Sequence, residues 1–491
     1  MSDNQEVDNK GSFSFNNNEE KPTSRYISPS NIFTFRLPQS RTPRLNIQVP
    51  RKATPLSSTL ILASSFACLI LLGTILLMLP VSTTSKNITS PVNALFTATS
   101  AVCVTGLTVV DTGTYWSTFG QAVLLVLFQI GGLGFIAGAT LLLLIIGGKI
   151  GLREKLVISE SMGIEKLGGI VSIVIKVTAF VFVTEAIGFV SLYLYWLNTG
   201  NQVPVWTAAF HTISAFNNCG MDLFGNFQSL QAYRGDTVVI LITAFLIIIG
   251  STGYITITES FQKMHWRKFS LETKLILSGT LIITLIGTIF YLITESNNPV
   301  TLGTSPFYQK ILESFFQTVT TRTAGFSTID MASLKPISKY FTMVLMFIGG
   351  APGSVAGGLK ITTFTILLLT ATSTLKGQNN VSIFGRQINY HTVFRAVTLL
   401  VAYLLVIGLV TLLLSFTENS AVENLLFETF SALSTVGLST GITPNLSIIG
   451  KIIITATMFI GRLGPLALMA YTVKSERPSE IEFPHENIRI G

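Results

Sequence analysis

Eight long apolar segments dominate the sequence. Each is long enough to cross about 30 Å of hydrocarbon as an α-helix, and together they cover 57–80, 118–147, 170–197, 237–258, 272–294, 340–372, 392–416 and 450–473. Hydrophobic residues make up 48% of the chain and charged residues 11%, and no connection between the segments is long enough to fold as a separate soluble domain. The sequence therefore predicts an all-α polytopic membrane protein with eight transmembrane helices.

The basic residues predict the orientation of these helices. Lysine and arginine are concentrated in the connections 148–169, 261–274 and 373–395 and in the two tails, 1–56 and 474–491. The positive-inside rule then places both termini in the cytoplasm. Residues 1–56 are rich in serine, asparagine and proline and lack an apolar core segment, so we expect a disordered cytoplasmic tail and no signal peptide.

Each outward-facing connection contains a moderately apolar segment of about 12–15 residues, which is too short to span and predicts a re-entrant helix. These segments resemble one another. Each begins with phenylalanine and reaches glycine ten residues later: FTATSAVCVTG (96–106), FHTISAFNNCG (210–220), FFQTVTTRTAG (315–325) and FETFSALSTVG (427–437). Internal similarity of this kind indicates a repeat architecture.

A second signature follows each of these segments, late in the next span: IGGLG (130–134), IGSTG (249–253), IGGAPG (348–353) and IGRLG (460–464). The repeating unit is therefore a span, a re-entrant pore helix, a glycine-centred loop and a second span. The four units cover 57–147, 170–258, 272–372 and 392–473. Units with the same membrane orientation predict a pseudo-fourfold axis along the membrane normal.

The glycine-centred loops predict a central pore. Non-helical backbone at membrane depth is tolerated only where it is buried in protein or lines a water-filled cavity. The carboxyl ends of four pore helices would carry partial negative charge toward the axis and favour a cation there. One such glycine would more often be a simple turn, but four in register favour a ring of backbone carbonyls that replaces the hydration shell of an ion.

The third unit contains a glycine-rich stretch, GGAPGSVAGGLK (349–360), in the middle of a span. Interior glycine costs a helix about 1 kcal/mol and proline about 3 kcal/mol relative to alanine, so the helix is expected to break here. A kink relieved by neighbouring helices is one interpretation. The other is an intramembrane loop at 349–358 that lies under the pore loops and gates ion flow.

Arg462 occupies the third position of the second signature, where the other units have Gly132, Ser251 and Gly350. An arginine at the centre of a span is costly and should face the protein interior or water. It could snorkel, or pair structurally with a carboxylate such as Glu185 or Glu259. Alternatively it is a fixed positive charge that borders the permeation path and contacts the glycine-rich stretch.

Other polar residues are weaker candidates. We expect Arg322, close before a pore-loop glycine, to point away from the axis and to pair with an acid or cap pore-helix carbonyls. Asp111 and Asp222 either concentrate cations at the outer mouth or are ordinary solvated loop acids. Packing or hydrogen-bonding roles are expected for three residues on or beside the pore helices: His211, Glu313 and Glu428.

The sequence contains no phosphate-binding loop, nucleophile elbow or pair of histidines at metal-ligand spacing, so it does not predict an enzyme. The three cysteines have neither metal-ligand spacing nor a disulfide pattern. The net charge of +8 reflects basic residues that the membrane topology requires, so it does not indicate nucleic-acid binding.

Taken together, the repeats resemble the Trk/Ktr/HKT superfamily of potassium transporters over about residues 57–491. Within it, TTRTAGFST (320–328), GGAPGSVAGGLKITTF (349–364) and the closing IRIG (488–491) look most like the membrane subunit of Ktr systems. The resemblance implies a potassium selectivity filter built from the backbone carbonyls of four residue pairs: Thr105 and Gly106, Cys219 and Gly220, Ala324 and Gly325, Val436 and Gly437. Plant-type relatives that favour sodium have serine at the first glycine, so Gly106 predicts potassium selectivity.

The resemblance also implies a gate, formed by Gly349, Gly350, Gly353, Ser354, Gly357, Gly358, Lys360 and Arg462. It further implies sodium-dependent potassium uptake across the plasma (inner) membrane, with sodium as an activator and no cofactor in this chain. A homodimer and a cytoplasmic ring of nucleotide-binding subunits are the implied partners. Two alternatives remain: a Trk-like or HKT-like transporter with different coupling or sodium permeability, and a polytopic membrane enzyme or scaffold whose repeats are only structural.

Overall fold

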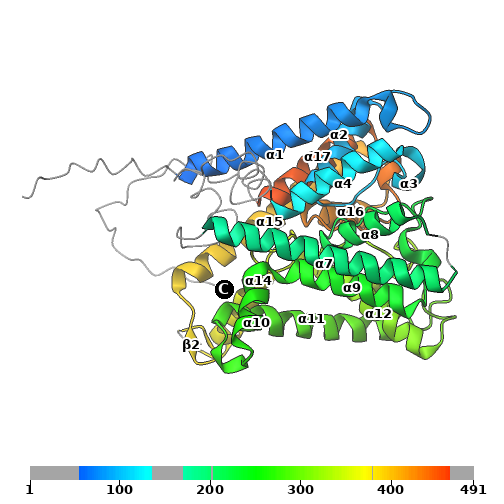
Figure 1. The fold of residues 1–491 in the computed structure, drawn as a ribbon. Helices are drawn as coiled ribbons and strands as arrows, with labels where there is room; N and C mark the ends of the chain where they lie inside the picture. The colour runs from blue at the N-terminus through cyan, green and yellow to red at the C-terminus, as the bar shows by residue number, and fades with distance from the viewer. Residues whose placement is uncertain (1–54, 135–169, 201–202, 379, 465–491) are drawn as a thin grey trace, which may run out of the picture. The chain divides into compact units, whose positions relative to one another are not determined.

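The computed structural model describes residues 55–134, 170–200, 203–378 and 380–464 (Figure 1). Most of these residues are helical, and the helices recur in one order: a long helix, a short helix, a loop and a further helix. The tail at 474–491, the connection at 148–169 and all but the last two residues of the tail at 1–56 lie outside the described residues, so the predictions for them stay predictions.

The first two of these four units share this order. The first contains α1 (Pro55–Met78), η1 (Pro80–Ser82), α2 (Pro91–Val102), α3 (Thr112–Tyr115) and α4 (Thr118–Leu133). The second contains α7 (Ile170–Asn198), α8 (Val205–Phe216), η2 (Ser229–Tyr233), α9 (Thr237–Thr252) and α10 (Tyr254–Lys263).

In the third unit a long break divides the final segment into two helices, whereas within the described residues the fourth unit ends in a single helix, as the first does. The third contains η3 (Trp266–Lys268), α11 (Leu271–Glu295), α12 (Phe307–Thr320), α13 (Pro336–Phe347) and α14 (Ile361–Leu375). A short antiparallel hairpin of β1 (Ser382–Ile383) and β2 (Arg386–Gln387) follows. The fourth unit contains α15 (Tyr390–Thr417), α16 (Val422–Leu433), η4 (Thr443–Asn445) and α17 (Ile448–Leu463).

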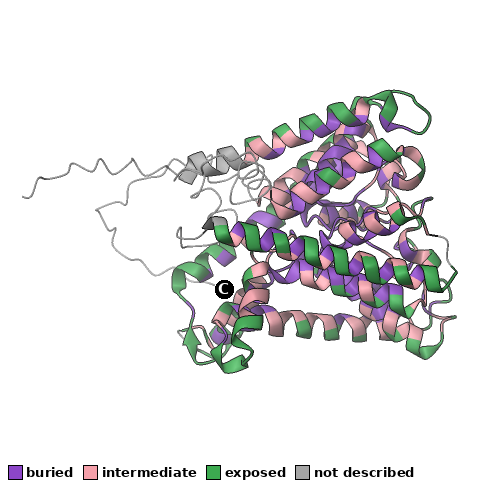
Figure 2. Ribbon diagram, in the orientation of Figure 1, coloured by how far each residue is buried: buried purple, intermediate pink, exposed green. Residues whose placement is uncertain are grey.

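Among the described residues, α7, α11 and α15 are long and apolar enough to cross a membrane, and α9 and α10 qualify together as one bent span. Shorter apolar helices are α4, α14 and the 63–78 part of α1. Large apolar side chains on the three long helices are exposed, including Ile187 (62%), Ile293 (72%) and Leu405 (63%). Figure 2 shows exposed residues recurring along α7. Such exposure is unfavourable in water and is expected of a surface that faces lipid. The chain is therefore a multi-pass membrane protein.

The prediction of one continuous helix over 237–258 is wrong. α9 ends at Thr252, and α10 begins at Tyr254 with its axis turned by 97°. The residue between them, Gly253, has φ +84°, a left-handed conformation that glycine adopts readily. The last glycine of the second signature ends a helix in the same way at Gly134 and Gly464.

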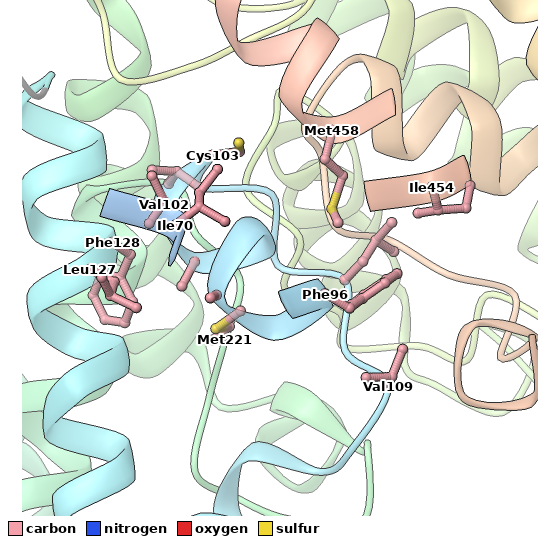
Figure 3. Close-up of a cluster of buried hydrophobic side chains, with 14 of the residues drawn as sticks. Ile70, Phe96, Val102, Cys103, Val109, Leu127, Phe128, Met221, Ile454 and Met458 are labelled. Atoms are coloured by element: carbon pink, nitrogen blue, oxygen red, sulfur yellow. The ribbon is translucent and has the colours of Figure 1, made fainter. Parts of the chain in front are cut away.

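The four short helices hold the units together. Three of them pack against the long helix that follows the loop in the preceding unit: α8 against α4, α12 against α9, and α16 against α13. α2 packs against α17, so the contacts join the fourth unit back to the first. A buried apolar cluster surrounds α2, with Phe96 and Val102 from α2, Phe128 from α4 and Met458 from α17 (Figure 3).

A candidate ion filter and gate

The short helices end with one shared backbone conformation. In each unit the residue two positions before the pore-loop glycine has a positive φ: Val104 (55°), Asn218 (55°), Thr323 (66°) and Thr435 (51°). This is uncommon for residues with a side chain and is typical of functional sites. In three units the next backbone N–H then reaches back to the last turn of the helix: Thr105 to Ser100 O, Cys219 to Ser214 O, and Val436 to Ser431 O. The third unit differs, because Ala324 N donates to Thr320 O.

The four pore-loop glycines lie in a closed ring with the carbonyl groups that precede them. All four have positive φ: +87° at Gly106, +77° at Gly220, +77° at Gly325 and +94° at Gly437. A Cβ added to any of them would collide with a carbonyl oxygen of the following unit. The pairs are Gly106 with Cys219, Gly220 with Ala324, Gly325 with Val436, and Gly437 with Thr105.

Glycine is required at these positions for two reasons: the conformation is left-handed, and the neighbouring backbone is too close for a side chain. The ring contains one carbonyl oxygen from each unit. Because the residues beside these oxygens are glycines, no side chain lies between the carbonyl groups. An arrangement of backbone carbonyls around one point can coordinate a dehydrated monovalent cation. The structure thus brings together all eight residues predicted for the filter.

A cavity of about 300 Å³ opens on one side of this ring. All four glycines line it, together with three carboxylates: Asp111, Asp222 and Asp330. Burial raises the pKa of the Asp222 carboxyl to about 6, against hydrogen bonds from Phe224 and Ser229 that lower it. Carboxylates around a concave mouth raise the local concentration of cations.

Asp111 also has a structural role at this mouth. Its carboxylate accepts a hydrogen bond of 2.8 Å from Thr114 N, at the start of α3, and one of 2.7 Å from Phe227 N. The second bond links the loops that follow the pore-loop glycines in the first and second units. Both interpretations from the sequence, a cation-attracting acid and an ordinary loop acid, are therefore compatible with its position.

Residues 348–360, which we call the intramembrane loop, connect α13 to α14 and contain no helix. Its two ends pair with each other, because Gly349 N donates to Leu359 O at 2.9 Å. Its middle is attached to the second unit, where Ala351 N donates to Ser251 O at 2.9 Å. Gly357 packs directly under the fourth pore loop, where a Cβ would collide with the Thr435 hydroxyl.

Two cations bind carbonyl groups of the intramembrane loop. Arg462 donates from one terminal nitrogen to Val355 O at 2.6 Å and from the other to Gly131 O. Lys360 donates from Nζ to Ala356 O at 2.6 Å. The structure therefore brings Arg462 and Lys360 together with the predicted gate glycines, and joins the first, third and fourth units at this point.

Neither carboxylate that the sequence offered as a partner for Arg462 contacts it. Glu185 accepts hydrogen bonds from Gln129 and Asn217, and Glu259 accepts from Ser270 and Lys263. The expectation for Arg322 is also corrected. It is 1% exposed, and its guanidinium donates to the Thr280 hydroxyl of α11 at 3.1 Å rather than to an acid or a helix carbonyl.

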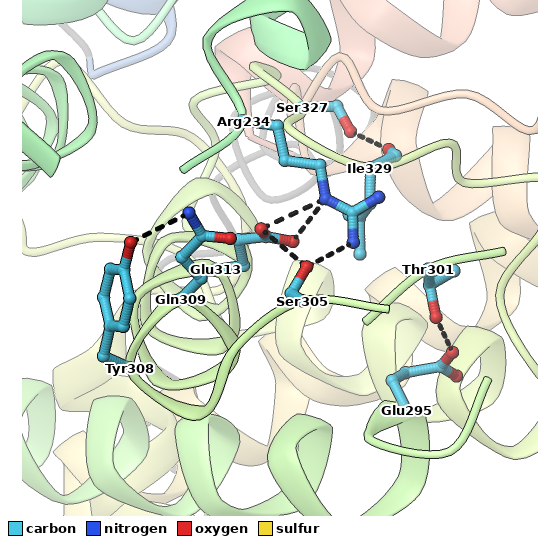
Figure 4. A network of polar contacts seen from close by, with 9 residues as sticks. All are labelled: Arg234, Glu295, Thr301, Ser305, Tyr308, Gln309, Glu313, Ser327 and Ile329. Carbon is cyan, nitrogen blue, oxygen red and sulfur yellow. Dashed lines mark hydrogen bonds and ion pairs between the residues drawn. The ribbon is translucent and has the colours of Figure 1, made fainter. Parts of the chain in front are cut away.

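The three polar candidates on or beside the pore helices have structural partners, as expected. Glu313 forms an ion pair of 3.0 Å with Arg234 (Figure 4). His211 Nε2 lies 3.1 Å from the Thr243 hydroxyl. Glu428 accepts a hydrogen bond of 3.0 Å from the Thr443 hydroxyl.

Sequence reasoning missed a buried polar cluster of Gln129, Glu185 and Asn217, considering Glu185 only as a possible partner of Arg462. The signal was available, because Glu185 is the one acid in the apolar segment 170–197. A charged residue within a span is a candidate functional site by default.

These features place the chain in a known class. The model of the TrkH family, described as a cation transport protein, matches residues 51–481, and the chain belongs to this family. It is 40% identical over 432 residues to the Ktr system potassium uptake protein B of Bacillus subtilis (strain 168), which covers 88% of this chain and 96% of that protein.

Two further comparisons agree with this assignment. The chain is 37% identical over 454 residues to the potassium/sodium uptake protein NtpJ of Enterococcus hirae, covering 91% of this chain and 100% of that protein. The crystal structure of the potassium transporter TrkH from Vibrio parahaemolyticus superposes with a TM-score of 0.71 at 19% identity and covers 86% of each chain. At this identity the structural likeness supports the fold alone. The family is one of transporters rather than of enzymes.

Proposed function

We propose that this chain is the membrane subunit of a potassium uptake system and conducts potassium through its central ring of carbonyls. The observation that carries the proposal is the closed ring formed by Gly106, Gly220, Gly325 and Gly437. Each of these glycines lies against the carbonyl group of the residue that precedes the glycine of the next unit. A potassium ion at its centre would exchange its hydration shell for these oxygens. The names of the relatives, which refer to potassium uptake, support the choice of ion.

The four units are proposed to surround the pore with pseudo-fourfold symmetry and eight membrane crossings, of which α9 with α10 and α13 with α14 are broken ones. The basic connections support a cytoplasmic location for both termini, and a plasma membrane location follows from an uptake function. The acidic cavity then faces outward and receives the ion.

The intramembrane loop is proposed to be the gate. Support comes from its position under the fourth pore loop and from the hydrogen bonds that Arg462 and Lys360 donate to its carbonyls. In this arrangement the loop obstructs the path, and the fixed positive charge of Arg462 beside it disfavours cation leak. Opening requires these hydrogen bonds to break together.

The energy source and the control of the gate are proposed to come from outside the pore. Sodium is the expected activator, in line with the potassium/sodium designation of the Enterococcus hirae relative. A cytoplasmic ring of nucleotide-binding subunits and a second copy of this chain are the expected partners. The alternative is a Trk-like or HKT-like transporter with different coupling or sodium permeability.

Flux measurements on the purified chain in liposomes test the proposal. We expect potassium-selective uptake of rubidium or potassium that responds to sodium. Equal permeation of sodium and potassium would count against the filter and favour the HKT-like alternative. If flux is absent until the regulatory partner is added, the filter remains and the gate is closed in the isolated chain.

A further inference from the structure

A buried carboxyl group lies between the first and second units without a cationic partner. Glu185, in the middle of α7, is 4% exposed. Gln129 of α4 donates from Nε2 to both carboxylate oxygens, at 3.0 and 3.2 Å. Asn217, at the end of α8, donates from Nδ2 to Oε1 at 3.0 Å. All three residues belong to helices that meet beside the second pore loop.

The charged and titratable groups of the surrounding helices do not neutralise this carboxyl. α4 and α9 contain none, and His211 of α8 bonds to Thr243. On α7 itself the nearest are Lys176, Tyr193 and Tyr195, at least about 12 Å away along the helix axis. Arg462 reaches Gly131 on α4 but binds its carbonyl. Within the described residues, no basic nitrogen lies within ion-pair distance of Glu185.

Asn217 provides a second and independent sign of an incomplete site. It is fully buried, yet its Oδ1 has no hydrogen-bond donor among the described residues. Its Nδ2 faces three acceptors with only two hydrogens: Gln129 Oε1 at 2.6 Å, Ile213 O at 2.9 Å and Glu185 Oε1 at 3.0 Å. One donor is therefore missing from the cluster, and a proton on the carboxyl would supply it.

We propose that Glu185, Gln129 and Asn217 form a proton-binding site. A proton from water adds to a carboxylate oxygen of Glu185, and the group becomes neutral, which an apolar interior strongly favours. The protonated carboxyl donates a hydrogen bond to an amide oxygen, and rotation of the Asn217 amide presents Oδ1 to it. Release of the proton restores the arrangement in which both amides donate to the carboxylate.

The site suits a proton better than a metal ion. Amide nitrogens already occupy both carboxylate oxygens, whereas a sodium ion would need oxygen atoms at those positions. Gly132 closes the other side of Asn217, because a Cβ there would collide with Oδ1. A proton needs only the rotation of one amide.

The position of Asn217 connects this site to conduction. It caps the second pore helix three residues before Gly220, and so acts as a positioning residue for the second quarter of the carbonyl ring. Gly131, two residues after Gln129 on α4, accepts a hydrogen bond from Arg462. Protonation of Glu185 is therefore expected to change ion flux. This expected change rests on the proposed potassium transport, whereas the proton site itself does not.

Infrared difference spectroscopy on the full chain in lipid tests the site directly. The wild-type protein should show the C=O stretching band of a protonated carboxyl that titrates within the pH range in which the protein stays folded, and Glu185→Gln should lack it. Asn217→Ala, which keeps Glu185, should shift the frequency of the same band. Glu428→Gln, which removes another buried carboxyl, is the matched control and should leave this band in place.

The result that overturns the proposal is a set of superimposable wild-type and Glu185→Gln spectra across this range, since Glu185 would then neither take up nor release a proton. A band that responds to added sodium at fixed pH would also overturn it, in favour of a metal site. If Glu185→Gln fails to fold, an unshifted band in Asn217→Ala is the contradicting result. In flux assays Glu185→Gln should flatten the pH profile, whereas absence of potassium flux in the wild type would contradict only the transport function.

Discussion

Arg462 of α17 donates a hydrogen bond of 2.6 Å to the carbonyl oxygen of Val355 in the intramembrane loop. The same guanidinium binds Gly131 O in the first unit. One side chain thereby ties the loop to two units that do not contain it. Because both acceptors are neutral carbonyls, neither hydrogen bond cancels the charge of Arg462, and in the proposed gate this charge would repel cations.

Arg462→Met should raise unregulated potassium flux, because the loop loses its tie to α17 and the path loses a fixed charge. We expect an increase of about tenfold, which corresponds to about 1.4 kcal/mol. Arg462→Lys should restore little of the control, since one ammonium cannot reach both carbonyls as the planar guanidinium does. Lys451→Met is the control, because Lys451 lies on the same helix but binds Asn93. Equal effects of the two methionine variants would argue against a role for Arg462 in gating.

Gly437→Ser should lower the preference for potassium over sodium, because the added side chain collides with Thr105 O and distorts one quarter of the carbonyl ring. A loss of about tenfold in the permeability ratio is expected, about 1.4 kcal/mol between the two ions. Gly408→Ala, in the same unit with open space around it, should leave selectivity unchanged. Unchanged ion preference in Gly437→Ser would remove the filter assignment.

Deletion of 353–357 should raise flux and weaken control by a regulatory partner, because the obstructing part of the loop is removed. A finer test uses Gly357→Ala, whose Cβ collides with the Thr435 hydroxyl and should displace the loop. Thr435→Ala should partly suppress this effect, giving an interaction energy of about 0.5–3 kcal/mol in a double-mutant cycle. Additive effects on flux would show that the loop and the fourth pore loop are not coupled, and a folded deletion variant with normal, partner-dependent flux would refute the gate.

The ring of four pore-loop glycines could be predicted because the repeats put them in register, and the break between α13 and α14 coincides with a run of glycines that disfavours helix. The bend at Gly253 was missed because the apolar pattern continues beyond it into α10. One of the two interpretations of Arg462, a contact with the glycine-rich stretch, is confirmed by its hydrogen bond to Val355 O. Its second acceptor, Gly131 O, could not be predicted. From the sequence, carboxylates are the natural candidates for a partner of Arg462 because their charge is opposite. Which backbone carbonyls are available as acceptors depends instead on which of them tertiary packing leaves unpaired.

Asp222→Asn should lower potassium uptake at low external potassium, because it removes one of three carboxylates that line the outer cavity. The loss should be about two- to tenfold and should shrink as ionic strength rises, since salt screens charges at a solvated mouth. Glu423→Gln is the matched control, because this acid pairs with Lys339 and does not line the cavity. A defect of the same size at every salt concentration would indicate a structural role for Asp222.

Arg234→Ala should destabilise the fold by about 3–5 kcal/mol, because it leaves a buried carboxylate without its counter-ion. The Glu313 side chain is fully buried, and Arg234 donates to both of its oxygens. Lys339→Ala breaks the more exposed pair with Glu423, whose charged atoms lie 3.8 Å apart, and should cost about 0–1 kcal/mol. Thermal unfolding of the purified variants in one detergent compares the two. Similar melting temperatures for both variants would mean that Glu313 carries no charge in the folded protein. In that case the double variant Arg234→Ala/Glu313→Gln should be no more stable than Arg234→Ala alone.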